Sequence, residues 1–109
     1  MKISCIEKKC QGYKFVAFEQ DKEIGRAHLY IMQNDLHTEP FGFMEDVFVD
    51  EQSRGMGAGK ELVKAVIETA KKVGCYKLVA TSRFSRSKVH ELYARLGFEQ
   101  QGVEFRINF

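Results

Sequence analysis

The sequence predicts one α/β domain in which helices pack against a mixed, mostly antiparallel sheet. A chain of 109 residues has the size of a single domain. Apolar residues make up 44% of it, with nine Phe and four Tyr, which is enough to bury one core. Segments with alternating apolar residues come first, and segments with apolar residues at helical spacing follow. The expected order is four strands, a helix, a strand, a helix and a final strand.

The first half of the chain is read as strands. Runs rich in β-branched and aromatic residues predict them over residues 3–9, 13–20, 23–32 and 43–49. A turn at Asp21 and Lys22 joins the second and third as a long hairpin. The fourth is unusual because two acidic residues, Glu45 and Asp46, stand among its apolar neighbours.

The second half alternates helices and strands. Apolar residues recur at helical spacing from 57 to 73, and Gly74 supplies a left-handed stop. A short buried strand over 77–81 and a helix over 87–96 follow, and Gly97 ends that helix. Residues 102–109 alternate again and predict a closing strand.

Composition excludes several classes of protein. No apolar run reaches the roughly 18 residues of a membrane span, and charge near the start interrupts any signal-peptide core, so we expect a cytoplasmic protein without membrane contact. Three cysteines without Cys-x-x-Cys spacing predict buried free thiols and no metal site. The net charge of +2 is too small to indicate nucleic acid. Residues 51–109, with eleven basic against six acidic residues, still suit an anionic ligand.

A glycine-rich loop precedes the first helix, where free N–H groups and the helix dipole favour an anion such as phosphate. It is too short for a nucleotide-triphosphate loop, and Glu61 stands where the magnesium-binding hydroxyl belongs. The dinucleotide fingerprint is missed as well. A turn without a ligand is the remaining alternative, but Lys60 opposes the helix dipole and so favours a bound anion. The loop residues are Arg54, Gly55, Met56, Gly57, Ala58, Gly59 and Lys60.

Four motifs in order resemble those of the GNAT family of N-acetyltransferases: Arg54-x-x-Gly57-x-Gly59, Glu45-Asp46-Val47-Phe48-Val49, Gly74-Cys75-Tyr76-Lys77-Leu78 and Leu92-Tyr93-Ala94-Arg95-Leu96-Gly97-Phe98. The second and third are most similar to glucosamine-6-phosphate N-acetyltransferases, and Glu-Asp also occurs in polyamine acetyltransferases. The run from His90 to Tyr93 resembles bacterial enzymes that acetylate small amines. The subfamily therefore stays open.

The resemblance implies acetyl-CoA as co-substrate. The glycine loop would hold its pyrophosphate, and the main chain of Val47, Phe48 and Val49 would pair with pantetheine like an added strand. Side chains of Val47–Val49 would pack as ordinary core residues in either case. Arg86 replaces the asparagine that often contacts pantetheine, and with Lys88 it would meet the 3′-phosphate or form a solvated face. Family members usually begin with a strand and two helices over the acceptor site, so the sequence predicts a reduced N-terminal helical region.

The resemblance also implies catalytic roles. Glu45 would be the general base that deprotonates an acceptor ammonium, with Asp46 as its backup or as an acceptor contact. Alternation places the two acids on opposite faces of the strand unless a bulge brings both round. Tyr93 would be the general acid for the CoA thiolate, although its spacing alone suits a core tyrosine. His90 would contact the acceptor or serve as a solvated or capping residue.

The implied function is direct acetyl transfer to a primary amine of a small molecule, within a ternary complex and without a covalent enzyme intermediate. The alternative is a non-catalytic acyl-CoA-binding or regulatory module of the same fold. A nucleic-acid-binding module ranks last because the basic residues 83–95 lack an aromatic stacking platform. Two helices leave part of the sheet uncovered, so we expect a homodimer in which residues 102–109 contribute to the interface.

Overall fold

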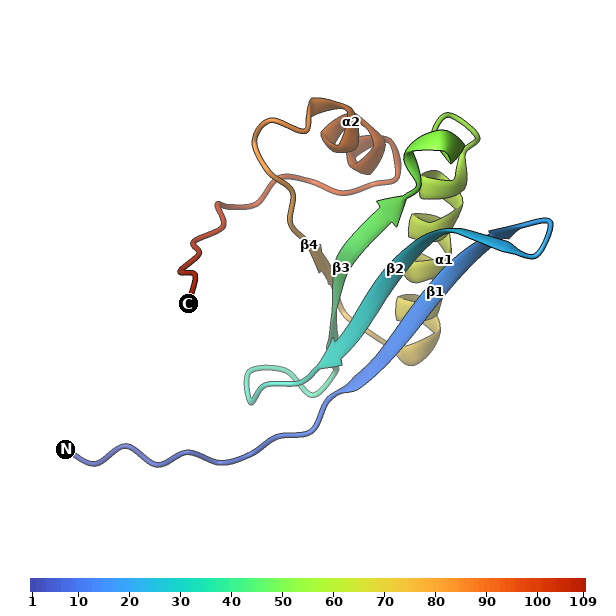
Figure 1. The fold of residues 1–109 in the computed structure, drawn as a ribbon. Helices are drawn as coiled ribbons and strands as arrows, with labels where there is room; N and C mark the ends of the chain where they lie inside the picture. The colour runs from blue at the N-terminus through green and yellow to red at the C-terminus, as the bar shows by residue number, and fades with distance from the viewer.

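The computed structural model describes residues 1–109 and contains a four-stranded sheet and two helices (Figure 1). The sheet order is β1-β2-β3-β4; β1, β2 and β3 are antiparallel, and β4 runs parallel to β3. This confirms the predicted mixed, mostly antiparallel sheet, and no helix precedes β3. The elements are β1 (Gln11–Glu19), β2 (Lys22–Met32), β3 (Phe41–Val49), a 3-10 turn η1 (Glu51–Ser53), α1 (Ala58–Val73), β4 (Leu78–Ala80) and α2 (Ser87–Arg95).

The hairpin between β1 and β2 turns within two residues. Gln20 and Asp21 have φ of 49° and 66°, the left-handed values of a tight hairpin turn. The register therefore follows from the turn and from the alternation in β2.

One face of the sheet is covered by α1. Ala27, Leu29 and Ile31 of β2 are buried there with Met44 of β3. From α1, four side chains at helical spacing complete this core: Leu62, Val63, Val66 and Ala70. Each fully buried aliphatic side chain stabilises the fold by about 1.5–3 kcal/mol. We call the opposite side of the sheet the open face, and Figure 1 shows it turned toward the viewer.

The second helix, α2, is less buried than α1. α2 has no fully buried residue, although Tyr93, Leu96 and Phe98 pack against the edge of the core. Gly74 and Gly97 follow the two helices with φ of 94° and 102°, as predicted for left-handed stops. Neither helix has the length and apolar character that crossing a membrane requires.

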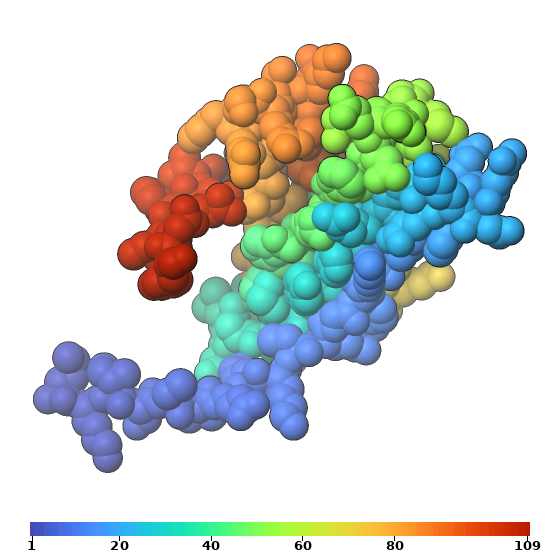
Figure 2. All heavy atoms as spheres, viewed as in Figure 1, coloured from blue at the N-terminus to red at the C-terminus, as the bar shows by residue number.

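Both predicted terminal strands are wrong. Residues 1–10 and 99–109 have no regular structure, and their apolar side chains, such as Ile6 and Phe105, are exposed. Figure 2 shows the first ten residues extending away from the body of the molecule. Residue type over 3–9 and alternation over 102–109 indicate side chains that suit a strand, but they do not supply a neighbouring strand. The prediction of buried thiols is also wrong for Cys5 and Cys10, which are exposed, whereas Cys75 is half-buried.

Candidate active site

A β-bulge in β3 brings Asp46 to the open face, where ordinary alternation already places Glu45. Glu45 pairs with His28 and Phe48 pairs with Arg26, so Ala27 alone faces Asp46 and Val47. Asp46 has a φ of 53°, a left-handed value inside a strand. Strict alternation would have sent Asp46 toward α1. The bulge is the exception to alternation that the sequence analysis allowed, because both carboxylates lie on the side opposite the core.

Beyond the bulge, β3 separates from β4. The two strands pair only over three residues each, and the last pair joins Met44 to Ala80. Asp50 N–H donates to Ile24 O, so the Val49 peptide groups point to the edge of β3 away from β2. Residues 45–49 therefore have no neighbouring strand on that edge. Val47 and Val49 pack their side chains on the core, and Phe48 is 38% exposed.

The glycine loop follows this free edge directly. Gly55 and Gly57 have φ of 88° and 84°, and no atom lies within 4 Å of the position of an added Cβ at either residue. Gly57 is the N-cap of α1 and gives no side-chain cap, so the N–H groups of Ala58, Gly59 and Lys60 have no partner inside the helix. Arg54, Met56 and Lys60 are exposed around them. Free donors, open space and positive charge fit an anionic phosphate group.

The tyrosine of α2, Tyr93, is less exposed to solvent than the glycine loop. The Tyr93 ring is half-buried, with its centre 5.2 Å from that of Phe98. Burial raises the pKa of Tyr93, and the charge of Arg86 lowers it in part. Its hydroxyl therefore stays protonated at neutral pH.

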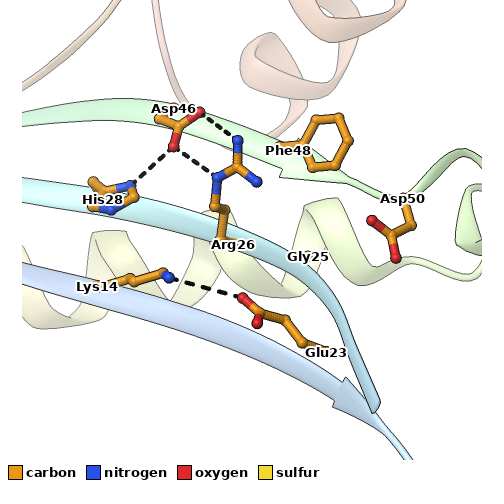
Figure 3. Close-up of a pocket in the computed structure, with 8 residues that line it drawn as sticks. All are labelled: Lys14, Glu23, Gly25, Arg26, His28, Asp46, Phe48 and Asp50. Carbon is orange, nitrogen blue, oxygen red and sulfur yellow. Dashed lines mark hydrogen bonds and ion pairs between the residues drawn. The ribbon is translucent and has the colours of Figure 1, made fainter.

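A polar cluster lies on the open face, and of its residues only Asp46 and Phe48 were predicted as site residues. It lines a shallow cavity of about 600 Å³, and its charged members come from all three long strands and from Asp50 just after β3 (Figure 3). The lining residues are Lys14, Glu23, Gly25, Arg26, His28, Asp46, Phe48 and Asp50. In the sequence, Arg26 and His28 are only the polar positions of an alternating strand, so no local signal marks them.

Arg26 and Asp46 form the strongest contact in this cluster. Arg26 Nε and Nη2 donate to Asp46 Oδ2 and Oδ1 at 2.7 and 3.1 Å. This hydrogen bonding holds the pKa of Asp46 below its usual range. His28 Nδ1 lies 3.4 Å from Asp46 Oδ2, but without the alignment of a hydrogen bond. Asp46 is thus a weaker base than an ordinary aspartate, whereas the exposed Glu45 has no hydrogen-bond or ion-pair partner.

The remaining predicted residues lie on α2, apart from this cluster. Arg86 is the N-cap of α2, and Lys88 is exposed in its first turn. His90 Nε2 is 2.9 Å from the carbonyl oxygen of Arg83, which fits the structural role weighed for it. The structure therefore groups the bulge acids with Arg26 and His28, and it places Arg86, Lys88 and His90 elsewhere.

Comparison with known proteins identifies relatives along most of the chain. The model of the acetyltransferase (GNAT) family matches residues 3–98. Glucosamine 6-phosphate N-acetyltransferase 1 of Oryza sativa subsp. japonica is 34% identical over 68 residues, which are 62% of this chain and 39% of that protein. Aminoglycoside N(6′)-acetyltransferase type 1 of Stenotrophomonas maltophilia is 32% identical over 94 residues, or 83% of this chain and 61% of that protein.

Solved structures agree with these matches. An acetyltransferase from Trypanosoma brucei has a TM-score of 0.81 and 29% identity, covering 90% of this chain and 69% of that one. The present chain spans less than two thirds of the length of the glucosamine 6-phosphate and aminoglycoside acetyltransferases named above.

Proposed function

This chain belongs to the GNAT family of acetyltransferases, and from that premise we propose that it is an acetyl-CoA-dependent N-acetyltransferase acting on a primary amine of a small molecule. One observation carries the proposal. Glu45 lies on the open face, the bulge brings Asp46 beside it, and the same strand then runs along a free edge into the glycine loop of α1.

The residues of the chain suit acetyl-CoA, which would supply an acetyl group activated as a thioester. The N–H groups of residues 58–60, with Arg54 and Lys60, suit the pyrophosphate. The free edge of residues 47–49 suits an amide-bearing chain that adds as a strand. Arg86 and Lys88 are exposed cations suited to a further phosphate.

Glu45 is the proposed general base. Its carboxylate takes a proton from the acceptor ammonium, and the freed amine nitrogen forms a bond to the thioester carbonyl carbon. The carbon–sulfur bond breaks as the tetrahedral intermediate collapses, and the Tyr93 hydroxyl gives its proton to the sulfur. The attacking nitrogen loses its second proton to water, and Tyr93 is reprotonated from solvent. A thiol has a pKa of about 8.5, so this second proton transfer contributes modestly.

The open face suits the acceptor. Glu45 and Asp46 attract a cationic amine there, and the fork from Arg26 keeps Asp46 ionised as a contact group. The relatives named for glucosamine 6-phosphate and for aminoglycosides support a small-molecule amine. We assign no acceptor contact to His90, because its Nε2 lies against the carbonyl oxygen of Arg83.

Calorimetry with acetyl-CoA tests the cofactor site. Wild-type protein should bind, and Gly57→Glu should bind much more weakly, because a side chain at a φ of 84° is strained and a carboxylate repels phosphate. An acceptor screen that detects thiol release tests the activity. Binding without release of thiol for any amine would favour the acyl-CoA-binding module. Absence of heat with the wild type would reject both.

We also propose a homodimer. β4 is an edge strand, and beside it lies a mainly apolar hollow of about 530 Å³, lined in part by Ile67, Leu78 and Phe98. The exposed residues Val103, Phe105 and Ile107 alternate, so this segment can add to β4 of a second copy and fill the hollow. Light scattering should give twice the chain mass, and deletion of residues 107–109 should abolish the dimer. An active wild-type monomer would contradict this proposal.

The exposed thiols of Cys5 and Cys10 bear on location. Unpaired exposed cysteines persist in a reducing compartment, which supports the cytoplasm as the proposed location.

A further inference from the structure

Arg26 contacts β3 at its bulge and again after it. In the ladder its partner is Phe48, and its guanidinium carbon lies 4.7 Å from the centre of the Phe48 ring. The same guanidinium reaches back along β3 to form the two hydrogen bonds with Asp46 (Figure 3). One side chain on β2 therefore holds the residue at the bulge and the second residue after it.

Asp46 needs such a contact because of its backbone. A left-handed φ of 53° is unfavourable for a residue that carries a Cβ, although aspartate tolerates it better than most. Arg26 is the only side chain hydrogen-bonded to the Asp46 carboxylate, since His28 lacks the required alignment. The two parallel bonds fix the orientation of the carboxylate, which a single ammonium cannot do.

The same contact keeps Arg26 away from a phosphate role. Its charge is paired with Asp46 at 2.7 Å, whereas Arg54 and Lys60 beside the glycine loop have no ion-pair partner. Arg54 Nε instead donates to the carbonyl oxygen of Val49 at 3.1 Å. The two arginines thus brace the start and the end of the segment from 46 to 49.

We propose that Arg26 is a positioning residue for acetyl-CoA: by holding Asp46 and Phe48, it maintains the bulge that presents the backbone of Val47–Val49 at the free edge of β3. This role rests on the proposed function, because it concerns the same cofactor site. It adds a residue of β2 that lies in none of the four motifs.

The test measures acetyl-CoA affinity by calorimetry in folded variants, with thermal unfolding as the check of folding. Arg26→Met should weaken binding about tenfold, and Arg26→Lys should lie between that variant and the wild type. The double variant Arg26→Met with Asp46→Gly should recover to within about threefold of the wild type, because glycine adopts the left-handed backbone without help. Lys72→Met removes a charge from the far end of α1 and should change nothing.

Amide hydrogen exchange in the protein without ligand gives a second readout. Arg26→Met should accelerate exchange at Asp50, whose N–H donates to Ile24 O across the ladder, while leaving Leu29 protected, and the double variant should restore slow exchange. Unchanged affinity in Arg26→Met, or a double variant as weak as the single one, would overturn the positioning role. If the wild type failed to bind acetyl-CoA, the proposed function would fail, and unchanged exchange would separately reject the hold on the bulge.

Discussion

Gly25 and Phe48 approach so closely that a Cβ added to Gly25 would lie 2.9 Å from the Phe48 carbonyl oxygen. Gly25 is buried in β2, and it lies directly before Arg26, the residue that spans the bulge. Only a glycine lets β2 and β3 keep their spacing where β3 enters its free edge. The backbone of β3 is thus held from the core side by close packing against Gly25 and from the open face by Arg26.

Gly25→Ala should therefore both destabilise the protein and weaken acetyl-CoA binding. Overpacking a site of this kind costs about 1–3 kcal/mol. The added methyl group pushes the Phe48 peptide outward, so affinity should fall together with stability. Urea unfolding and calorimetry measure the two effects, and Gly102→Ala, where an added Cβ meets nothing within 4 Å, is the control. Wild-type behaviour of Gly25→Ala would show that β3 can move at no cost.

Glu45→Gln tests the base. Turnover should fall about 100-fold, and most at low pH, where the acceptor is protonated and needs a base. Acetyl-CoA affinity should stay near the wild-type value, since the side chain faces the acceptor side. Glu68→Gln, on an exposed position of α1, is the matched control. An unchanged pH–rate profile would move the role to water, because Asp46 is held by Arg26.

Tyr93→Phe tests the acid while keeping the ring that packs on Phe98. We expect a fall in kcat of about tenfold with unchanged acetyl-CoA affinity and stability. Because burial raises the pKa of Tyr93, the wild-type rate should not decline through loss of this proton below about pH 10. Tyr76→Phe, an exposed tyrosine, is the control. A rate equal to that of the wild type would return Tyr93 to the core role.

Asp46→Asn should reveal a stability difference that depends on pH. The Arg26 hydrogen bond lowers the folded-state pKa of Asp46, so the stabilisation is complete above the unfolded value of about 3.9 and is lost as pH falls through the folded value. The difference in unfolding free energy between wild type and variant should be constant from about pH 7 to 5 and shrink below about pH 4. Urea unfolding across this range measures it. A difference that grew toward low pH would have the wrong sign for this pair.

Most elements were predictable because their periodicity is local. The strands of the hairpin, the helix ended by Gly74 and the helix ended by Gly97 all follow from side-chain spacing and glycine stops. Residues 3–9 were predicted from strand-forming residue types, as β1 was, yet they stay unpaired because a strand also needs a partner along its edge. Local pattern cannot report that partner.

The site was predictable in part for the same reason. The glycine loop, Glu45 and Tyr93 are marked by motifs along the chain, whereas Arg26 acts across a ladder twenty residues away from Asp46. Its contact depends on the register between β2 and β3, and that register changes at the bulge. The two acids among apolar residues were the only local sign that the strand is irregular.

Because β3 and β4 pair over only three residues, the parts of the molecule on either side of this pairing should differ in local stability. The hairpin, β3 and α1 share the fully buried core, but α2 contributes no fully buried side chain to it. We expect α2 to open and close many times for each global unfolding event, with its amides exchanging hydrogen faster than those of α1. The proposed base, Glu45, then belongs to the part that stays folded, and Tyr93 belongs to the part that opens. A ligand that bridges β3 and α2 would slow this breathing, so acetyl-CoA should protect α2 even at residues that it does not touch.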